Sequence, residues 1–257
     1  MVVDSALKTQ GRVIYALMMR EVHTIYGSSR LGYLWALVDT MTGVVIFWAL
    51  RTVMGFQPPH GMPILFFLLA GFCLFSIFRG TVSKCMSAVS ANKALLTFPQ
   101  VTPLDFMVGR MVVLWGKELV SALILIIVAT LIGIYFKVSN FAVFVFTLIM
   151  PALLGLGVGM ICHAINTYFP VTEKIVNIIL RIMFFTSGVF FSITRFPSYV
   201  MDYVWWNPMI QVIEMCRMSI SSGYRAMPYS VFYLCSCTAI SLCLGLLLER
   251  HVRRKLR

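Results

Sequence analysis

The sequence predicts an all-α, polytopic membrane protein with six transmembrane helices. Hydrophobic residues make up 60% of its 257 residues and charged residues only 12%, a composition that is not typical of soluble domains. Six apolar segments approach the roughly 20 residues that a helix needs to cross a hydrocarbon core of about 30 Å. An N-terminal amphipathic interface helix and a short re-entrant helical hairpin between spans five and six complete the predicted fold. The spans cover residues 32–54, 62–82, 119–136, 141–166, 175–193 and 229–248.

The basic residues predict how the spans are oriented. Basic residues in short loops stay on the cytoplasmic side of a membrane, and most of them here lie before the first span, between spans two and three, or after span six. Both termini are therefore predicted to be cytoplasmic. The net charge of +12 follows from this topology and from attraction to anionic headgroups, so it does not indicate nucleic-acid binding. The predicted outer loops hold only Lys137, Arg195, Arg217 and Arg225.

Residues 1–31 are predicted to form a cytoplasmic amphipathic helix, and residues 32–257 the six-span domain. Ile14, Met18 and Val22 recur every four residues, while basic and polar residues fall on the opposite side of the same helix. Such a helix lies in the membrane interface. From the pattern alone, it is either a membrane anchor or an element with a further role.

The longest predicted cytoplasmic loop lies between spans two and three and contains two helical signals. The first, about 84–98, ends in the apolar residues Leu95, Leu96 and Phe98, which are costly to expose to water. We therefore expect it to contact a partner protein; the alternative is packing against the chain's own N-terminal helix. The second begins at Thr102, where a hydroxyl cap is followed by proline and an acidic residue, and it continues into the third span.

The segment of about 194–228, between spans five and six, is predicted to be re-entrant at the outer face. Its apolar pieces are too short to cross a bilayer, and two short helices are expected, the second capped by Asn207 with Pro208 in its first turn. Trp205 and Trp206 suit the outer membrane interface, where amphipathic rings concentrate. An aromatic belt is favoured over sugar stacking for any one of these rings.

The sequence contains no enzymatic motif: there is no nucleophile elbow, no HExxH zinc motif, no pair of carboxylates at useful spacing and no Walker A loop. We expect no catalytic residue, no metal site and no cofactor bound by this chain. The seven cysteines have no metal-ligand spacing near a histidine and are interpreted as packing residues. If transport is driven by ATP, another polypeptide must bind the nucleotide.

Several runs of residues resemble permeases of the ABC-2 type polysaccharide exporters, and the resemblance extends over essentially the whole chain. Two runs resemble the start of the first span in that family, and a later run resembles its outer segment. The capsular polysaccharide branch matches best. Many relatives have Leu-Glu-Pro where this chain has Val38-Asp39-Thr40, so the proline is missing and the acid is shorter. The runs are Met19-Arg20-Glu21, residues 26–37, and Trp206-Asn207-Pro208-Met209 followed by Glu214 and Arg217, with Gln10-Gly11-Arg12 and residues 187–191 pointing to the capsular branch.

The resemblance implies a homodimer with a polymer pathway at the dimer interface and two copies of an ABC ATPase subunit beneath it. ATP and Mg would then be bound by that partner and not by this chain. The resemblance also implies that the N-terminal helix and the segment 84–98 transmit ATPase motion to the spans. Further implied partners are a lipid-linked polysaccharide, membrane lipids, and periplasmic and outer-membrane export proteins. The expected ATPase-coupling residues are Lys93, Leu95, Leu96 and Phe98.

Aromatic and ionisable residues within the spans are the candidates for the substrate pathway. Aromatic rings can stack on the apolar faces of sugars, and charges at membrane depth usually face a cavity or a partner. The alternative to a pathway role is, for each aromatic ring, packing in the bundle or contact with lipid. For the two arginines, the alternative is that they extend to the lipid headgroups. The candidates are Tyr33, Trp35, Asp39, Phe72, Phe75, Arg79, Arg181, Phe184 and Phe191.

The expected function is export of a lipid-linked capsular polysaccharide across the inner membrane of a bacterium, driven by a separate ATPase. The nearest alternative is another ABC-2 exporter, carrying O-antigen, teichoic acid or a small drug. A secondary transporter or channel is a second alternative, although such proteins usually have midplane ions or repeated broken spans, which this sequence does not show. A membrane enzyme of polymer synthesis is a weaker third.

Overall fold

The structure, a computed structural model, describes residues 6–26, 30–55, 61–89, 91–92, 101–135, 137–193, 197–224 and 228–256. Within these ranges the chain folds into α-helices joined by turns and contains no strand. The helices are α1 (Ala6–Tyr26), α2 (Arg30–Val53), α3 (Ile64–Met86), α4 (Pro103–Leu131), α5 (Phe141–Tyr168), α6 (Thr172–Thr186), α7 (Ser198–Val204), α8 (Pro208–Ile220) and α9 (Val231–Leu256).

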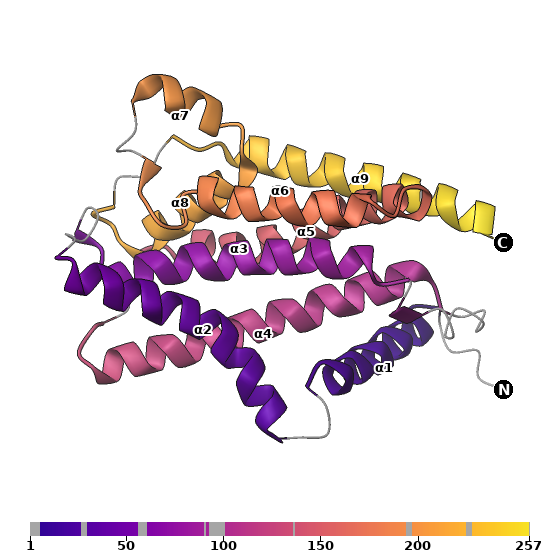
Figure 1. Cartoon of the computed structure of the whole chain (residues 1–257), viewed down its shortest axis with the longest axis horizontal. Helices are drawn as coiled ribbons and strands as arrows, with labels where there is room; N and C mark the ends of the chain where they lie inside the picture. The colour runs from indigo at the N-terminus through magenta and orange to yellow at the C-terminus, as the bar shows by residue number, and fades with distance from the viewer. Residues whose placement is uncertain are drawn as a thin grey trace.

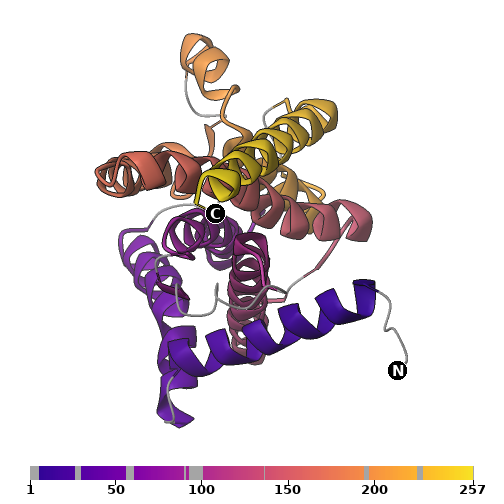
Figure 2. The ribbon, with the colours of Figure 1, turned by 90° about the vertical axis from the view of Figure 1, so that its right-hand side faces the viewer.

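The long helices lie side by side and alternate in direction along the chain (Figure 1). As a result, α1 and the C-terminal part of α9 lie at one end of the bundle, whereas α7 and α8 lie toward the other (Figure 1). Figure 2 shows α1 lying across the bundle and not along it. We call the two ends the α1 end and the α7 end.

Four of the described helices are long and apolar enough to cross a bilayer, namely α3, α4, α5 and the segment Val231–Arg253 of α9. The described apolar part of α2 is shorter, Thr40–Val53. The helix expected over 175–193 is also shorter, because α6 ends at Thr186 and has 15 residues. Gly188 follows with φ of 69°, a left-handed conformation that glycine adopts readily and that turns the chain away from the helix axis.

Glycines allow α5 to pack closely between α3 and α9. A Cβ atom on Gly157 would lie 2.5 Å from Oγ of Ser241 and 2.7 Å from the backbone nitrogen of Leu242, both on α9. A Cβ atom on Gly159, also on α5, would lie 2.7 Å from Cβ of Cys85 on α3. Small residues at helix contacts let backbones approach closely in membrane bundles, so α5 is fixed between its two neighbours.

The α3 helix is the centre of the bundle. In its most apolar stretch 78% of residues are buried, against 17% in that of α9. Phe67, Leu68 and Ile77 of α3 have no exposed surface. Large apolar side chains on the outer helices remain exposed, including Leu131, Ile182 and Leu247. An apolar surface of this kind is expected where a helix faces lipid or another membrane subunit.

The helix predicted to begin at Thr102 does so, whereas the segment 84–98 does not begin a separate α-helix within the described residues. The α4 helix begins after Thr102, and the carboxylate of Asp105 accepts hydrogen bonds from the backbone nitrogen and the hydroxyl of Thr102, at 2.8 and 2.9 Å. It then continues without interruption into its apolar part. The predicted segment 84–98 begins inside α3, and turns follow over residues 87–89. Its remaining residues from 93 onward lie outside the described residues.

Candidate functional site

Three of the predicted pathway residues come together in an aromatic cluster between α2, α3 and α6. The ring centroid of Phe184 lies 5.3 Å from that of Phe72 and 5.4 Å from that of Phe75. Phe190, which follows α6, lies 5.0 Å from Phe184. Phe47 of α2 joins through Phe190, at 4.6 Å. We use the name aromatic cluster for Phe47, Phe72, Phe75, Phe184, Phe185 and Phe190.

The aromatic cluster is buried on its α3 side and open on its α6 side. Phe75 and Phe72 are almost fully buried, so within one subunit they act as packing residues. Phe185 is 55% exposed and stacks on Phe190, with ring planes 17° apart and centroids separated by 5.6 Å. The exposed part of the cluster therefore consists of a ring that sequence reasoning did not select.

The structure describes the other predicted pathway residues only in part. Arg79 on α3 and Arg181 on α6 are exposed. Phe191 is half-buried in the turn after α6. The side chains of Tyr33, Trp35 and Asp39 lie outside the described residues, although their backbone belongs to α2. The predicted ATPase-coupling residues, Lys93, Leu95, Leu96 and Phe98, also lie outside the described residues.

The α7 end carries a second aromatic group held by hydrogen bonds. The indole nitrogen of Trp205 donates to the backbone oxygen of Pro228 at 2.9 Å. The hydroxyl of Tyr233 on α9 donates to the backbone oxygen of Trp206 at 2.6 Å. The rings of Trp205 and Tyr233 lie 5.0 Å apart. Because their polar groups are bonded within the protein, these two rings are fixed in place and do not direct those groups toward lipid headgroups.

A cavity of about 440 Å³ opens beside these rings. Trp206 lies at the edge of this cavity and is 67% exposed, and Asp202 contributes a carboxylate to the lining. The combination of flat apolar rings with a hydrogen-bond acceptor is suited to a sugar, whose ring has C–H faces to stack and hydroxyls to bond. The cavity is lined by Met201, Asp202, Trp205, Trp206 and Pro228; we call it the tryptophan cavity.

Asn207 and Pro208 hold the start of α8 as predicted. The side-chain oxygen of Asn207 accepts a hydrogen bond from the backbone nitrogen of Met209 at 3.0 Å, and Pro208 occupies the first turn of the helix. The side-chain nitrogen of Asn207 donates to Oγ of Ser187 at 3.1 Å. The capping residue therefore also ties α8 to the end of α6.

A buried arginine fixes α8 against the centre of the bundle. Arg217 has no exposed surface, and its Nη1 donates to Oε1 of Glu214 at 3.0 Å. Its Nε and Nη2 donate to the backbone oxygen of Phe67 on α3, at 3.3 and 3.2 Å, and Nη2 donates to that of Val189 at 3.0 Å. The guanidinium carbon lies 3.5 Å from the centroid of the Phe67 ring. The planar, forked guanidinium can donate to all of these acceptors together, which the ammonium group of a lysine cannot do.

Tyr224 completes this arrangement, which we call the Arg217 clamp (Phe67, Val189, Glu214, Arg217 and Tyr224). Its hydroxyl donates to both carboxylate oxygens of Glu214 at 3.0 Å. Burial raises the pKa of Tyr224 to about 12, so the hydroxyl stays protonated and remains a donor at physiological pH. Sequence reasoning placed Glu214 and Arg217 in the family-like run but did not select them as site residues. The available signal was a pair of opposite charges three residues apart in an apolar helix.

A second buried charge that was not selected lies on α4. Glu118 is 4% exposed, and its Oε1 accepts a hydrogen bond from the hydroxyl of Thr40 on α2 at 3.0 Å. The ammonium nitrogen of Lys117 lies 3.0 Å from the same oxygen. Polar groups within an apolar bundle are costly unless paired. The hydrogen bond between Thr40 and Glu118 therefore fixes the position of α2 relative to α4.

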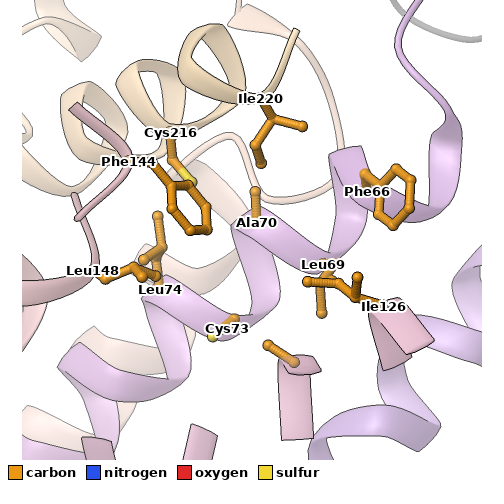
Figure 3. Close-up of a pocket in the computed structure, with 11 residues that line it drawn as sticks. Phe66, Leu69, Ala70, Cys73, Leu74, Ile126, Phe144, Leu148, Cys216 and Ile220 are labelled. Atoms are coloured by element: carbon orange, nitrogen blue, oxygen red, sulfur yellow. The ribbon is translucent and has the colours of Figure 1, made fainter. Parts of the chain in front are cut away.

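Figure 3 shows a smaller cavity between α3, α4, α5 and α8. It has a volume of about 40 Å³, and carbon and sulfur atoms of apolar side chains and of Cys73 and Cys216 line it (Figure 3). A lining of this kind offers no hydrogen-bonding side chain for a sugar. Among the described residues, no group of three or more His, Cys, Asp or Glu side chains is placed to hold a metal ion.

Comparison with known proteins gives matches along almost the whole chain. The family described as ABC-2 type transporter matches residues 12–221. The polysialic acid transport protein KpsM of Escherichia coli is 30% identical over 249 residues, which cover 96% of this chain and 95% of that protein. The capsule polysaccharide export inner-membrane protein CtrC of Neisseria meningitidis is 25% identical over 94% of this chain and 91% of that protein. The capsule polysaccharide export inner-membrane protein BexB of Haemophilus influenzae is 26% identical over 96% of this chain and 93% of that protein.

Proposed function

Because this chain belongs to the ABC-2 type transporter family, we propose that it is the transmembrane subunit of an ATP-driven exporter of lipid-linked capsular polysaccharide. The observation that carries the proposal is similarity over almost the full length to three capsule-export or polysialic acid transport proteins. Two of these relatives are described as inner-membrane proteins. This chain is accordingly a permease and not an enzyme, and ATP is hydrolysed by a separate subunit.

The proposed topology has six spans, formed by α2, α3, α4, α5, α6 and α9. The alternation of helix direction supports this count (Figure 1), and four of the six meet the length and hydropathy of a span. The α1 end faces the cytoplasm, because the cluster of basic residues in the last two turns of α9 lies there. The segment containing α7 and α8 is then a re-entrant hairpin at the outer face.

The proposed assembly is a homodimer bound to two ATPase subunits that carry ATP and Mg. Residues 1–31 form the amphipathic helix at the membrane interface. The ATPase contacts the segment 84–98 through Lys93, Leu95, Leu96 and Phe98. The exposed apolar face of α6 supports a contact with a second membrane subunit. Periplasmic and outer-membrane export proteins would receive the polymer.

The pathway is proposed to run along the face where α2 and α6 present aromatic rings, and to leave past the tryptophan cavity. Phe185, stacked on the half-buried Phe190, forms its exposed aromatic surface, and Trp206 lies at its outer end. Stacking on flat rings requires no particular hydroxyl pattern, so a polymer can slide from one ring to the next. The Arg217 clamp holds α8 rigid beside this route.

Two measurements test the proposal. In a bacterium that carries this gene, deletion should leave capsular polymer inside the cell, as seen by fractionation with an antibody to the polymer. The protein should also copurify with an ABC ATPase. Unchanged surface polymer in the deletion strain would exclude capsule as the substrate, and a protein that never associates with an ATPase under any nucleotide condition would exclude the mechanism.

A further inference from the structure

A buried arginine joins three helical segments at the α1 end. Nε of Arg110 on α4 lies 3.0 Å from Oε1 of Glu21 on α1. Its Nη1 donates to the backbone oxygen of Lys84 at 3.0 Å and to Oγ of Ser87 at 3.2 Å, at the C-terminal end of α3. Arg110 and Glu21 are 8% and 9% exposed. We call these four residues the α1–α4 joint.

Two further hydrogen bonds connect α1 to both sides of the loop between α3 and α4. Arg20 donates from Nη2 to the side-chain oxygen of Asn92, which is itself buried and bonded to the turn after α3. Gln10 donates to the carboxylate of Asp105 in the first turn of α4. In the chain, these links flank residues 93–100. A displacement of that segment would therefore reach α1 from both sides.

The backbones of α1 and α4 also approach closely at Gly109. A Cβ atom on Gly109 would lie 3.8 Å from Cβ of Leu17 and 3.7 Å from Cγ of Met18. No larger side chain separates the two helices at this point. Cβ atoms of disulfide-bonded cysteines lie about 3.5–4.5 Å apart, so a cysteine pair at 17 and 109 has a Cβ separation suited to a disulfide.

These contacts are more than a membrane anchor requires. An interfacial anchor needs an apolar face toward lipid and a charged face toward water. Here α1 turns a carboxylate, Glu21, inward to a buried arginine, and it uses Gln10 and Arg20 for specific bonds to the chain. Buried ion pairs contribute little net stability but fix geometry, and removing one partner leaves an uncompensated buried charge.

We propose that α1, the end of α3 and the start of α4 move as one rigid unit during transport, and that Arg110 is the positioning residue that holds the unit together. The unit passes a displacement of the expected coupling residues, within 93–98, to the two spans α3 and α4 at once. The role in transport rests on the proposed function, whereas the rigidity of the unit does not depend on what is exported.

The first experiment compares cross-linking in different nucleotide states. The Leu17→Cys/Gly109→Cys variant is purified with its ATPase partner and oxidised without nucleotide, with ATP, and after trapping with ATP and vanadate. A rigid unit gives the same disulfide yield and rate in all three states. A yield or rate that changes with nucleotide overturns the proposal, whatever the substrate is. The single variants Leu17→Cys and Gly109→Cys control for bonds to the chain's own seven cysteines.

The second experiment measures coupling. In Arg110→Ala, we expect polymer export to fall about tenfold or more while the complex still assembles and hydrolyses ATP, because the buried carboxylate loses its partner. Adding the cysteine pair to Arg110→Ala and oxidising it should restore export, and dithiothreitol should abolish the rescue. The exposed Arg250→Ala at the same end is the matched control and should export normally.

Two outcomes of the second experiment would overturn the proposal. One is loss of export when the cysteine pair is oxidised in the otherwise unchanged chain, because the joint would then have to open during transport. The other is normal export by Arg110→Ala. If the unchanged chain exports no polysaccharide at all, the proposed function fails, and the cross-linking experiment alone decides on the rigid unit.

Discussion

Arg217 shows how one side chain can determine the position of a whole segment. Its guanidinium reaches backbone oxygens in α3 and in the turn after α6, and it also pairs with Glu214 on its own helix. Gly71 makes room for it, because a Cβ atom there would lie 3.1 Å from Nη2 of Arg217. Three segments that are distant in the sequence are therefore held by the three nitrogen atoms of one planar group.

Arg217→Lys is expected to destabilise the protein although it preserves the charge. An ammonium group cannot reach both backbone oxygens and the carboxylate together, so buried acceptors lose their donors at a cost of about 2–4 kcal/mol. The melting temperature of the purified protein in detergent should fall by roughly 5–10 °C. The exposed Arg181→Lys is the control and should melt as the unchanged protein does. Equal melting of both variants would show that the clamp contributes no stability.

Trp206→Ala is expected to weaken export without changing stability. Its ring is 67% exposed at the edge of the tryptophan cavity and meets Trp205 and Tyr233 only edge-on, so its loss removes mainly a stacking surface. An aromatic contact of about 0.5–1.5 kcal/mol corresponds to roughly a two- to tenfold lower export rate. Tyr203→Ala removes an even more exposed ring of α7 that does not line the cavity, and it should leave export unchanged. Equal effects of the two variants would indicate a membrane belt instead.

At the scale of elements, the helices differ in what defines them. The starts of α4 and α8 depend on local signals, a hydroxyl or amide cap followed by proline, and these were predictable from the sequence. The end of α6 was missed: Gly188 directly after the C-cap Ser187 is a local stop signal, but the apolar run that continues past it favoured a longer helix. The position of α5 depends on glycines whose neighbours are more than 70 residues away in the chain.

Gly157→Ala is expected to destabilise the bundle. The added methyl group would meet backbone atoms of α9, which cannot move aside as a flexible side chain can, and overpacking of this kind costs about 1–3 kcal/mol. Gly116→Ala on α4 is the matched control, because a Cβ atom there has no neighbour within 4 Å. Thermal melting in detergent should separate the two. A Gly157→Ala protein that melts no lower than Gly116→Ala would contradict the close α5–α9 contact.

At the scale of the whole molecule, the sequence predicted the class and the membrane character, whereas it did not predict the long-range pairs. Composition and segment length determine whether a chain enters a bilayer, and both are known from the sequence without knowledge of the fold. The pairing of Glu21 with Arg110, by contrast, joins helices α1 and α4, and spacing along the chain contains no information about it. Three of the predicted aromatic residues, Phe72, Phe75 and Phe184, lie in one cluster, but rings for packing and rings for a pathway look alike in sequence. The predicted coupling residues stay a prediction.

The proposed orientation of the molecule predicts opposite accessibility at its two ends. In intact cells, a membrane-impermeant maleimide should label Tyr203→Cys on α7 and should not label His251→Cys near the end of α9, although both positions are exposed. After the membrane is opened, both should react. The unchanged protein, with its own cysteines, gives the background. Labelling of His251→Cys before the membrane is opened would invert the topology.

The sandwiching of α5 between α3 and α9 also constrains how the chain is made. Helix α9 leaves the ribosome after α5, so the α5 surface at Gly157 stays uncovered by α9 while the intervening segments are inserted. During that interval this α5 surface is accessible to chaperones and membrane proteases. Biogenesis is therefore most vulnerable before α9 docks, and variants that slow docking should be degraded early instead of failing later as transporters.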